Sequence, residues 1–533
     1  MKKNLFNKLI NNNILYLSLL ILIAFFANFY YANLGVFPID TFLHYDAAYK
    51  ILNGEYPVKD YWIVSGFIVD FLQAFFFQIL GVNWKSYVVH SSIINLSTSI
   101  LTYYIFLNLN LKKITSTVYA ICFSLLAYPT SGTPFVDLHA TFFCLIAIYL
   151  TLFYVIKPNR SLLWVAIIFF YFLAFFSKQT PTAYLITLNV LIFGHYFFLK
   201  NKRKVILIII ISTLFFLFLF ILILKFLNIE IINLYIQYLA YPIEIGTSRV
   251  DNFNFSFEKF FNRYKFILLP FIILTIVKLK KLAENKNPFF SKEMMIYLIF
   301  FSTLISFLIH QLITKNQIYI YFLIPIFCAY LHSEINQRNY KKKKIIIILI
   351  LISTILITFK YHIRYNEGKK FHDFIYIDLS KSIEAEVIDK SLSSLKWSTF
   401  FFRGESIQEI NLIKEIILEL NLKSKNIILA THYSFLDSVT KKKLNNLNRT
   451  YTLDGASMPL VNNKYYNVYK NFILKKILDQ DIEEIYLIKE EGLDEGLVHN
   501  YINKECLLKK EDKIFIIYEI NKNCAKKIIN SNL

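Results

Sequence analysis

The chain has 533 residues, of which 56% are hydrophobic and 18% are charged, with a mean hydropathy of +0.46 and a formal net charge of +21. This composition and the long apolar runs exclude a soluble globular class. The basic excess does not indicate nucleic-acid binding, because the lysines and arginines lie in short clusters between apolar runs, as the positive-inside rule requires.

The apolar runs are the dominant feature of the first 360 residues. Runs such as 14–34, 205–227 and 345–359 show no amphipathic period, and about 20 such residues match the hydrocarbon thickness of a bilayer. We therefore predict a polytopic α-helical membrane protein. Its eleven predicted crossing helices lie at 14–34, 86–107, 114–129, 136–156, 161–177, 181–199, 204–227, 264–282, 294–313, 317–334 and 344–360.

The segment 62–80 is ambiguous, because it is apolar but contains Asp70, Gln73 and Gln78. If it does not cross, the basic clusters, including "KNKRK" at 200–204, fall on the cytoplasmic side. If it crosses, most of them fall outside. We therefore predict an interfacial or re-entrant helix at 62–80, with the amino terminus inside and the tail outside.

In this orientation the polar, non-basic segments of the membrane half share the outer face, where they could form one site. The alternative is ordinary loop polarity. These segments are 35–62, 128–139, 176–184, 228–263 and 310–319.

The first outer segment is dense in titratable side chains. Pro38 suits a turn, and Asp40 can cap a short amphipathic helix that runs to about Asn53, where Gly54 stops it. A cap is also the simplest alternative to a chemical role for Asp40.

The stretch "HYDAAYKILNGEYPVKDYW", after a first span and an early Asp and before "GFIVDFLQAFFFQILG", resembles the GT-C glycosyltransferases. The resemblance is closest to the branch that uses polyprenyl-phosphate sugars, which includes the aminoarabinose transferases and protein mannosyltransferases. It covers the first 110 or so residues, with looser support to about 335. It implies a GT-C-like bundle with interfacial helices in the first outer loop.

The resemblance also implies site residues. An acidic residue of the first outer loop acts in that family as catalytic base or positions the acceptor, and the matching residue is Asp40, with His44 and Tyr45 as substrate contacts. Asp46 and Asp60 remain alternatives for the base. His44 replaces a basic residue of the relatives, and their Lys-Pro pair ahead of the re-entrant helix is absent.

Transfer from a lipid phosphate also needs a positive group to hold the departing phosphate. Lys178 with Gln179 and Lys315 with Gln317 each precede an apolar helix, whose amino-terminal dipole favours anions. The alternative is a lysine that snorkels to the membrane surface.

Three further features of the membrane half are candidates for a binding or structural role. Arg249 and Arg263 in the long outer loop are additional candidates for the phosphate clamp. Asp137 and His139 are either a second acidic site or a pair of metal ligands; we expect no obligatory cofactor, and a divalent cation is an alternative. His310 ends a span, where we expect it to form hydrogen bonds between helices.

The tail, 361–533, is polar with short apolar runs, which predicts a soluble α/β or α+β domain after a transmembrane domain at 1–360. Strands are predicted in "NIILATHYS", "EEIYLIKEE" and "KIFIIYEIN", and a helix at 407–420. Cys506 and Cys524 flank the last strand and could pair in an oxidising compartment.

These features together predict a glycosyltransferase of the bacterial inner membrane. It would move a sugar from a polyprenyl-phosphate donor to a lipid, glycan or protein acceptor on the outer face of the bilayer, with inversion. The alternatives are a transporter or flippase of lipid-linked sugars, which predicts two related halves with discontinuous helices, and an enzyme-like scaffold with a dead site.

Overall fold

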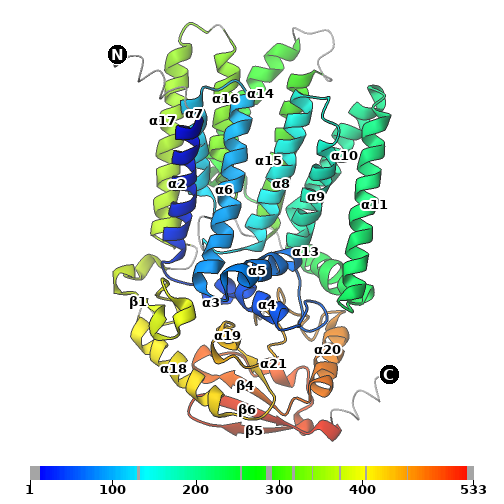
Figure 1. Cartoon of the computed structure of the whole chain (residues 1–533), viewed down its shortest axis with the longest axis vertical. Helices are drawn as coiled ribbons and strands as arrows, with labels where there is room; N and C mark the ends of the chain where they lie inside the picture. Colours follow the sequence, from blue (N-terminus) through cyan, green and yellow to red (C-terminus); the bar gives the residue numbers. More distant parts are fainter. Residues whose placement is uncertain are drawn as a thin grey trace. The chain divides into compact units, whose positions relative to one another are not determined.

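The computed structural model describes residues 13–128, 132–251, 255–283, 291–314, 319–338, 340–370, 374–402, 405–452 and 454–524. The chain forms two compact units (Figure 1). The helical unit contains Met1–Ala32, Val88–Ile221 and Arg249–Ile375, and the mixed unit contains Asn33–Tyr87, Leu222–Ser248 and Tyr376–Leu533. The first loop after α2 therefore belongs to the same compact unit as the tail. The predicted division at residue 360 rests on composition and stays a prediction.

The helical unit is built from long apolar helices. They are α2 (Asn13–Ala32), most of α6 (Trp84–Asn108), α7 (Lys113–Leu126), α8 (Val136–Ile156), α9 (Leu163–Ser177), α10 (Gln179–Leu199), most of α11 (Arg203–Phe226), α14 (Phe257–Ala283), α15 (Lys292–Thr314), α16 (Leu323–Asn336) and α17 (Lys343–His362).

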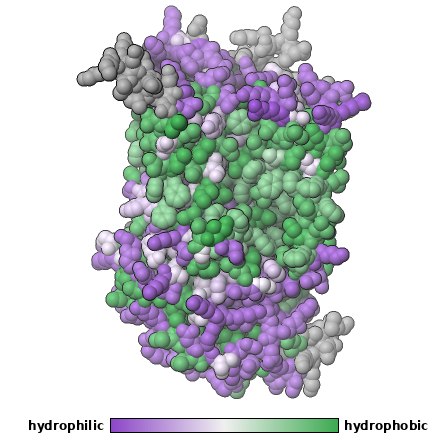
Figure 2. Space-filling model, viewed as in Figure 1, coloured by the Kyte–Doolittle hydropathy of each residue, from purple (hydrophilic) through white to green (hydrophobic). Residues whose placement is uncertain are grey.

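Within the described residues, seven helices are long and apolar enough to cross a membrane: α2, α8, α10, α11, α14, α15 and α17. Figure 2 shows hydrophobic residues along the sides of the long helices and hydrophilic residues at their ends. The side chains of α11 illustrate the cause, since Leu207, Ile211 and Leu214 are more than half exposed. Such a surface is stable only against an apolar solvent, so the chain is a membrane protein.

Each of the eleven predicted spans is helical in the structure, but α6, α7, α9 and α16 do not qualify by length and composition. Helices α7 and α9 have 14 and 15 residues, which is about 21–23 Å at 1.5 Å per residue and less than the ~30 Å hydrocarbon core. Helix α6 is long enough but buries several polar side chains, Ser91, Asn95 and Thr102 among them. The number eleven stays a prediction.

A polar contact holds the helices of this unit together near α2. The Asn28 amide donates to the Ser92 hydroxyl (2.9 Å) and to the Gly132 carbonyl (3.1 Å). Gly132 has φ +62°, and a Cβ there would come within 2.6 Å of Ala32 Cβ, so only glycine fits this close approach.

The mixed unit combines short helices with two small sheets. Its elements are α3 (Pro38–Thr41), α4 (Leu43–Leu52), α5 (Phe67–Leu80), α12 (Ile231–Tyr235), η1 (Ile236–Ala240), most of α13 (Tyr241–Asp251), β1 (Ile383–Glu384), β2 (Lys396–Trp397), α18 (Ser406–Leu422), β3 (Ile427–Ala430), α19 (Leu436–Thr440), α20 (Tyr466–Asp479), β4 (Glu484–Ile488), α21 (Gly496–His499), β5 (Leu507–Glu511) and β6 (Phe515–Ile520).

The larger sheet has the strand order β3-β4-β6-β5, with β3 and β4 parallel and the other neighbours antiparallel. The three strands and the helix predicted in the tail are confirmed as β3, β4, β6 and α18, and β5 and α20 are additional. Strands β3 and β4 are buried along their whole length, which explains their continuous apolar sequences. Cys506 and Cys524 form the disulfide that the sequence allowed.

Charged groups join the first loop to the tail inside the mixed unit. The Asp70 carboxylate on α5 is fully buried and accepts hydrogen bonds from the Arg449 guanidinium and from His44 Nδ1, the latter at 2.7 Å. Arg449 also donates to the Ser65 carbonyl. Beside this pair, the Trp62 backbone N–H donates to the Leu447 carbonyl at 2.8 Å. Asp70, one of the polar residues that made the segment 62–80 ambiguous, is thus paired with a cation of the tail.

Two predicted helix boundaries are wrong. Asp40 does not cap a helix that runs to Asn53; it lies inside α3, whose N-cap is Phe37, because Pro38 suits the first helical position. The predicted stop is confirmed, since α4 ends at Leu52 with Asn53 as C-cap and Gly54 at φ +79°. Helix α5 begins at Phe67 instead of residue 62, because Trp62 pairs with the tail.

Replacing Arg449 should unfold the mixed unit more easily. In Arg449→Met, the Asp70 carboxylate is left buried without its cation, which costs about 3–5 kcal/mol. We expect a lower thermal midpoint of the purified protein in detergent. The matched control is Glu415→Gln, which breaks the exposed Lys513–Glu415 ion pair (2.9 Å) and should change stability by less than about 1 kcal/mol. An equal midpoint for Arg449→Met and the control would contradict this role.

Candidate functional site

A buried carboxylate lies where three helices of the helical unit meet. Asp137, in the first turn of α8, accepts hydrogen bonds from Lys178 Nζ at 2.7 Å and from His310 Nε2 at 2.8 Å. Lys178 is the N-cap of α10, and His310 lies on α15. The Thr180 hydroxyl lies 2.9 Å from His310 Nδ1, which helps to hold the orientation of the imidazole. The expected hydrogen bond between helices at His310 is confirmed.

Lys178 is the part of this cluster that solvent reaches, because its side chain is 17% exposed whereas those of Asp137 and His310 are at most 1% exposed. An ammonium group has three donors, and Asp137 takes one of them. The position at the start of α10 adds the favourable end of the helix dipole for an anion. Gln179 is half-buried beside it as the first residue of α10.

His139 does not join Asp137 in a metal site. Its Nε2 lies 3.1 Å from His90 Nε2, and its Nδ1 contacts the Phe135 carbonyl at 3.0 Å. Among the described residues, no three His, Cys, Asp or Glu side chains are grouped to hold a metal ion. The two candidates are held by different partners, so the structure gives no support to the cation alternative at this pair.

The helical unit also has a large apolar groove between α9, α10 and α11. Its volume is about 620 Å³. The side chains that line it are almost all apolar and include Trp164, Phe172, Phe176, Phe193, Ile210 and Leu217. Phe176, near the end of α9, also lines the groove and precedes Lys178 by two residues in the chain.

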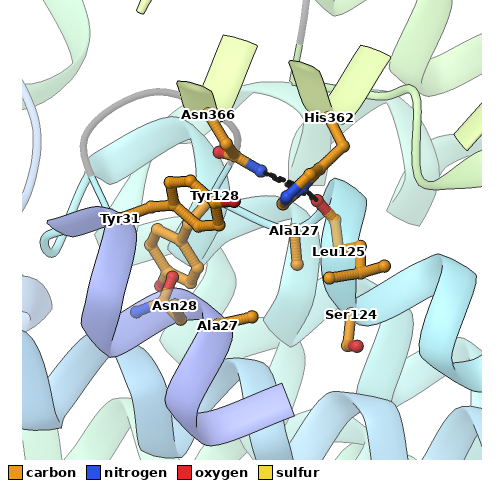
Figure 3. A pocket seen from close by; sticks show the side chains of 9 residues that line it. All are labelled: Ala27, Asn28, Tyr31, Ser124, Leu125, Ala127, Tyr128, His362 and Asn366. Atoms are coloured by element: carbon orange, nitrogen blue, oxygen red, sulfur yellow. Dashed lines mark hydrogen bonds between the residues drawn. The ribbon is translucent and has the colours of Figure 1, made fainter. Parts of the chain in front are cut away.

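A second cavity in the helical unit is too small for a substrate. It has a volume of about 10 Å³, which is room for about one water molecule. Figure 3 shows His362, the last residue of α17, and Asn366, in the turn that follows, directed at the Leu125 carbonyl of α7, to which Asn366 donates at 3.0 Å. These side chains satisfy a carbonyl at the end of α7 and have a structural role.

The three candidate acids of the first loop differ in environment. Asp46 is 2% exposed and pairs with Lys50 at 2.8 Å, one helical turn later in α4. Asp60 closes the turn before Tyr61, because its Oδ2 accepts the Tyr56 N–H at 2.8 Å, while its Oδ1 lies 3.4 Å from Lys476 Nζ. Asp40 is half-buried in α3. Asp46 and Asp60 therefore have structural ion pairs, which makes them poorer bases than the resemblance alone suggests.

The proposed substrate contacts at 44 and 45 lie inside the mixed unit. His44 and Tyr45 are fully buried. His44 bonds Asp70, and the Tyr45 ring packs against Phe77 at 4.9 Å between ring centroids. Their contact with substrate stays a prediction.

A further acid, Asp437, joins Asp46 and Lys50 from the tail. Burial raises the pKa of Asp437 well above its usual range, and the neighbouring Asp46 carboxylate raises it further. Burial alone would lower the pKa of Lys50, but the Asp46, Asp437 and Glu55 carboxylates outweigh it and raise the pKa. Burial also raises the pKa of Asp46, while Lys50 opposes that shift, so the protonated form is favoured most clearly at Asp437.

The remaining predicted substrate contacts are Arg249, Arg263, Lys315 and Gln317. Arg249 is half-buried on α13, and Arg263 is exposed on α14. Neither contacts the Asp137 cluster in the hydrogen bonds and ion pairs of the structure that we describe. Lys315 and Gln317 lie outside the described residues, and their role stays a prediction.

Several residues of these clusters escaped the sequence analysis. Lys50 follows Asp46 by four residues, a spacing that predicts an ion pair on a helix, and Asp70 is an acid in an apolar helix, which predicts a buried partner. Arg449 and Asp437 carry no such signal, because they lie almost 400 residues from the first-loop groups that they face.

No protein-family model matches the chain, and no curated protein is significantly similar to it in sequence.

The burial of Asp437 predicts that the protein tolerates replacement of this acid by its neutral amide. Asp437→Asn replaces a protonated acid with a neutral amide of the same shape, so stability at pH 7 should be retained or raised. A raised acid pKa means that the native state holds a proton that the unfolded state releases above pH ~3.9. Wild-type stability therefore falls as pH rises from there, and the advantage of Asp437→Asn should grow over the same range.

The contrasting variant is Lys50→Met, which leaves the buried Asp46 carboxylate without the ammonium group that pairs with it. We expect it to lose about 3–5 kcal/mol, and to lose more as pH rises, because that carboxylate must ionise. Thermal midpoints between pH 5 and pH 9 measure both effects. A pH-independent difference between wild type and Asp437→Asn would show that Asp437 is ionised in the native protein.

Proposed function

We propose that the chain is a membrane glycosyltransferase that transfers a sugar from a lipid-phosphate donor to an acceptor hydroxyl. The observation that carries the proposal is the apolar groove of about 620 Å³ in the helical unit, which extends to Phe176, two residues before Lys178. A long hydrocarbon chain ending in a phosphate is the kind of ligand that needs both an apolar groove and a cation at its end.

The residues of the helical unit suit donor binding. The groove binds the polyprenyl chain, and Lys178 binds the phosphate with the donors that Asp137 leaves available. Asp137 and His310 hold the ammonium group in place, and they are themselves too buried to touch a ligand. As the phosphate leaves, its negative charge grows, so this ammonium stabilises the transition state more than the bound donor.

Asp40 is the base that the family resemblance implies, and this part of the proposal rests on the resemblance. The acceptor hydroxyl oxygen attacks the anomeric carbon, the bond from that carbon to the phosphate oxygen breaks, and the hydroxyl proton passes to the Asp40 carboxylate. This single displacement inverts the anomeric configuration. Asp40 is favoured by the family resemblance and by its partial exposure.

The base is tested with Asp40→Asn. Transfer of labelled sugar from a polyprenyl-phosphate donor in membranes should fall by about 10²–10⁴-fold, while the thermal midpoint stays that of wild type. Unchanged transfer would remove Asp40 as the base. Translocation of lipid-linked sugar without any transfer, unaffected by this variant, would favour the transporter alternative.

The groove is tested with Gly194→Phe. Gly194 lines the groove on α10, and a Cβ added there meets no atom within 4 Å, so the new ring can occupy the groove without a clash in the fold. We expect KM for the lipid donor to rise about tenfold, the effect of losing about 1.4 kcal/mol of binding. The matched control is Gly246→Phe, also at a glycine with open space but on α13 outside the groove. Equal KM values for both variants would contradict the assignment of the groove.

A further inference from the structure

The mixed unit has a polar cavity that the transfer reaction does not use. Its volume is about 210 Å³, below the ~300–1,000 Å³ of sites for drug-sized ligands. Three segments form it: the turn at 58–60, the residues around α12 and the end of α20. Six of the side chains that line it are charged: Lys59, Lys475, Lys476, Asp60, Glu230 and Asp479.

The charges of this cavity balance, three positive against three negative. Several are also fixed in place. Lys476 is 6% exposed and lies 3.4 Å from Asp60 Oδ1 and 4.0 Å from Glu55 Oε2. The Asn233 amide donates to Glu230 Oε2 at 2.9 Å. A phosphate or another anion would need unopposed lysines, and a cation would need unopposed carboxylates. The lining therefore favours a ligand without net charge.

The cavity also has one aromatic wall. The Phe472 ring packs edge-on against Trp62 at 5.8 Å and stacks with Tyr469 at 6.3 Å, which hold its orientation. A polyol ring has hydroxyl groups that both donate and accept hydrogen bonds, and apolar C–H faces that pack on an aromatic ring. The ammonium, carboxylate and amide groups that line the cavity can donate to and accept from such hydroxyl groups, and the Phe472 ring can pack against the C–H groups.

The backbone at this cavity is held in an unfavourable conformation. Val58 lines the cavity and has φ +75°, which a β-branched residue rarely adopts. Gln237 holds it, because its amide donates to the Val58 carbonyl at 2.9 Å while its carbonyl accepts the Ile63 N–H at 3.1 Å. Such strain is most often retained at binding sites, and here it presents Lys59 and Asp60 to the cavity.

We propose that this cavity binds one sugar residue. That this residue belongs to the acceptor glycan rests on the proposed function; the binding of a saccharide does not. On this assignment, the mixed unit holds the acceptor chain at a sugar other than the one that reacts, so it selects glycan acceptors over lipid or protein acceptors.

The test is direct binding to the full-length protein in lipid nanodiscs, since maltoside detergents carry sugar headgroups. Saturation-transfer NMR would use glucose, galactose, mannose, N-acetylglucosamine and rhamnose as probes. Zwitterionic glycine, which has no net charge but no hydroxyl groups or ring, and anionic inorganic phosphate are the comparisons that carry formal charges. We expect at least one sugar to bind with a dissociation constant of the order of 1–10 mM, and neither charged comparison to displace it.

Two variants of cavity residues and one control test whether the sugar binds in this cavity. Phe472→Ala and Glu230→Gln should each weaken sugar binding at least tenfold; Glu230 is exposed, so that variant does not depend on core packing. The matched control is Tyr376→Ala, an aromatic residue of the same unit that is 95% exposed and outside the cavity. Binding that is absent for all five sugars, replaced by glycine or phosphate, or unchanged in both variants would overturn the proposal.

The two proposals fail separately. Sugar binding that persists in Asp40→Asn, together with loss of transfer, supports both. Sugar binding in a protein that transfers no sugar overturns the proposed function and leaves the cavity assigned. Transfer without sugar binding at this cavity overturns only the present inference.

Discussion

The buried ion pair between Asp70 and Arg449 is the interaction on which the mixed unit depends. Asp70 sits on an apolar helix at zero exposure, where an isolated carboxylate would be costly. Arg449 and His44 neutralise it, and the Trp62–Leu447 backbone hydrogen bond runs beside them. Since the partners come from a loop near the start of the chain and a segment near its end, neither segment can fold stably in this form without the other.

This constraint changes how the first-loop acids are understood. In the sequence they are a set of similar carboxylates, but in the structure each has a different environment. Asp46 is neutralised by Lys50, Asp60 closes a turn and faces Lys476, and Asp40 remains half-buried in a four-residue helix. The ion pairs of Asp46 and Asp60 help to hold the loop in shape.

The helical unit shows a different use of charge. One buried carboxylate, Asp137, organises a lysine and a histidine from two other helices at 2.7 and 2.8 Å. In a low-dielectric environment such a cluster is rigid, because loss of any member leaves a buried charge uncompensated. Asp137 thus fixes the ammonium group of Lys178 at the start of α10.

The sequence alone determined the membrane class, the helical segments and the strands of the tail, because apolar runs of fixed length and β-rich runs are local properties. It also named Lys178 as a lysine beside an apolar helix, Asp137 as a second acidic site or metal ligand, and Asp40 through the family resemblance. The four-residue spacing of Asp46 and Lys50 predicts their ion pair on a helix. The start of α5 could not be predicted from the local sequence, because Trp62 pairs with the tail.

Only the tertiary structure decided which charges meet. Arg449 and Asp70 are 379 residues apart, Lys178 and Asp137 are 41 apart, and the polar cavity draws on three separate segments. Ion pairs and cavities of this kind depend on long-range packing, which leaves no periodic signal in a single sequence. The sequence could therefore name the candidate residues, and the fold assigned each its partner.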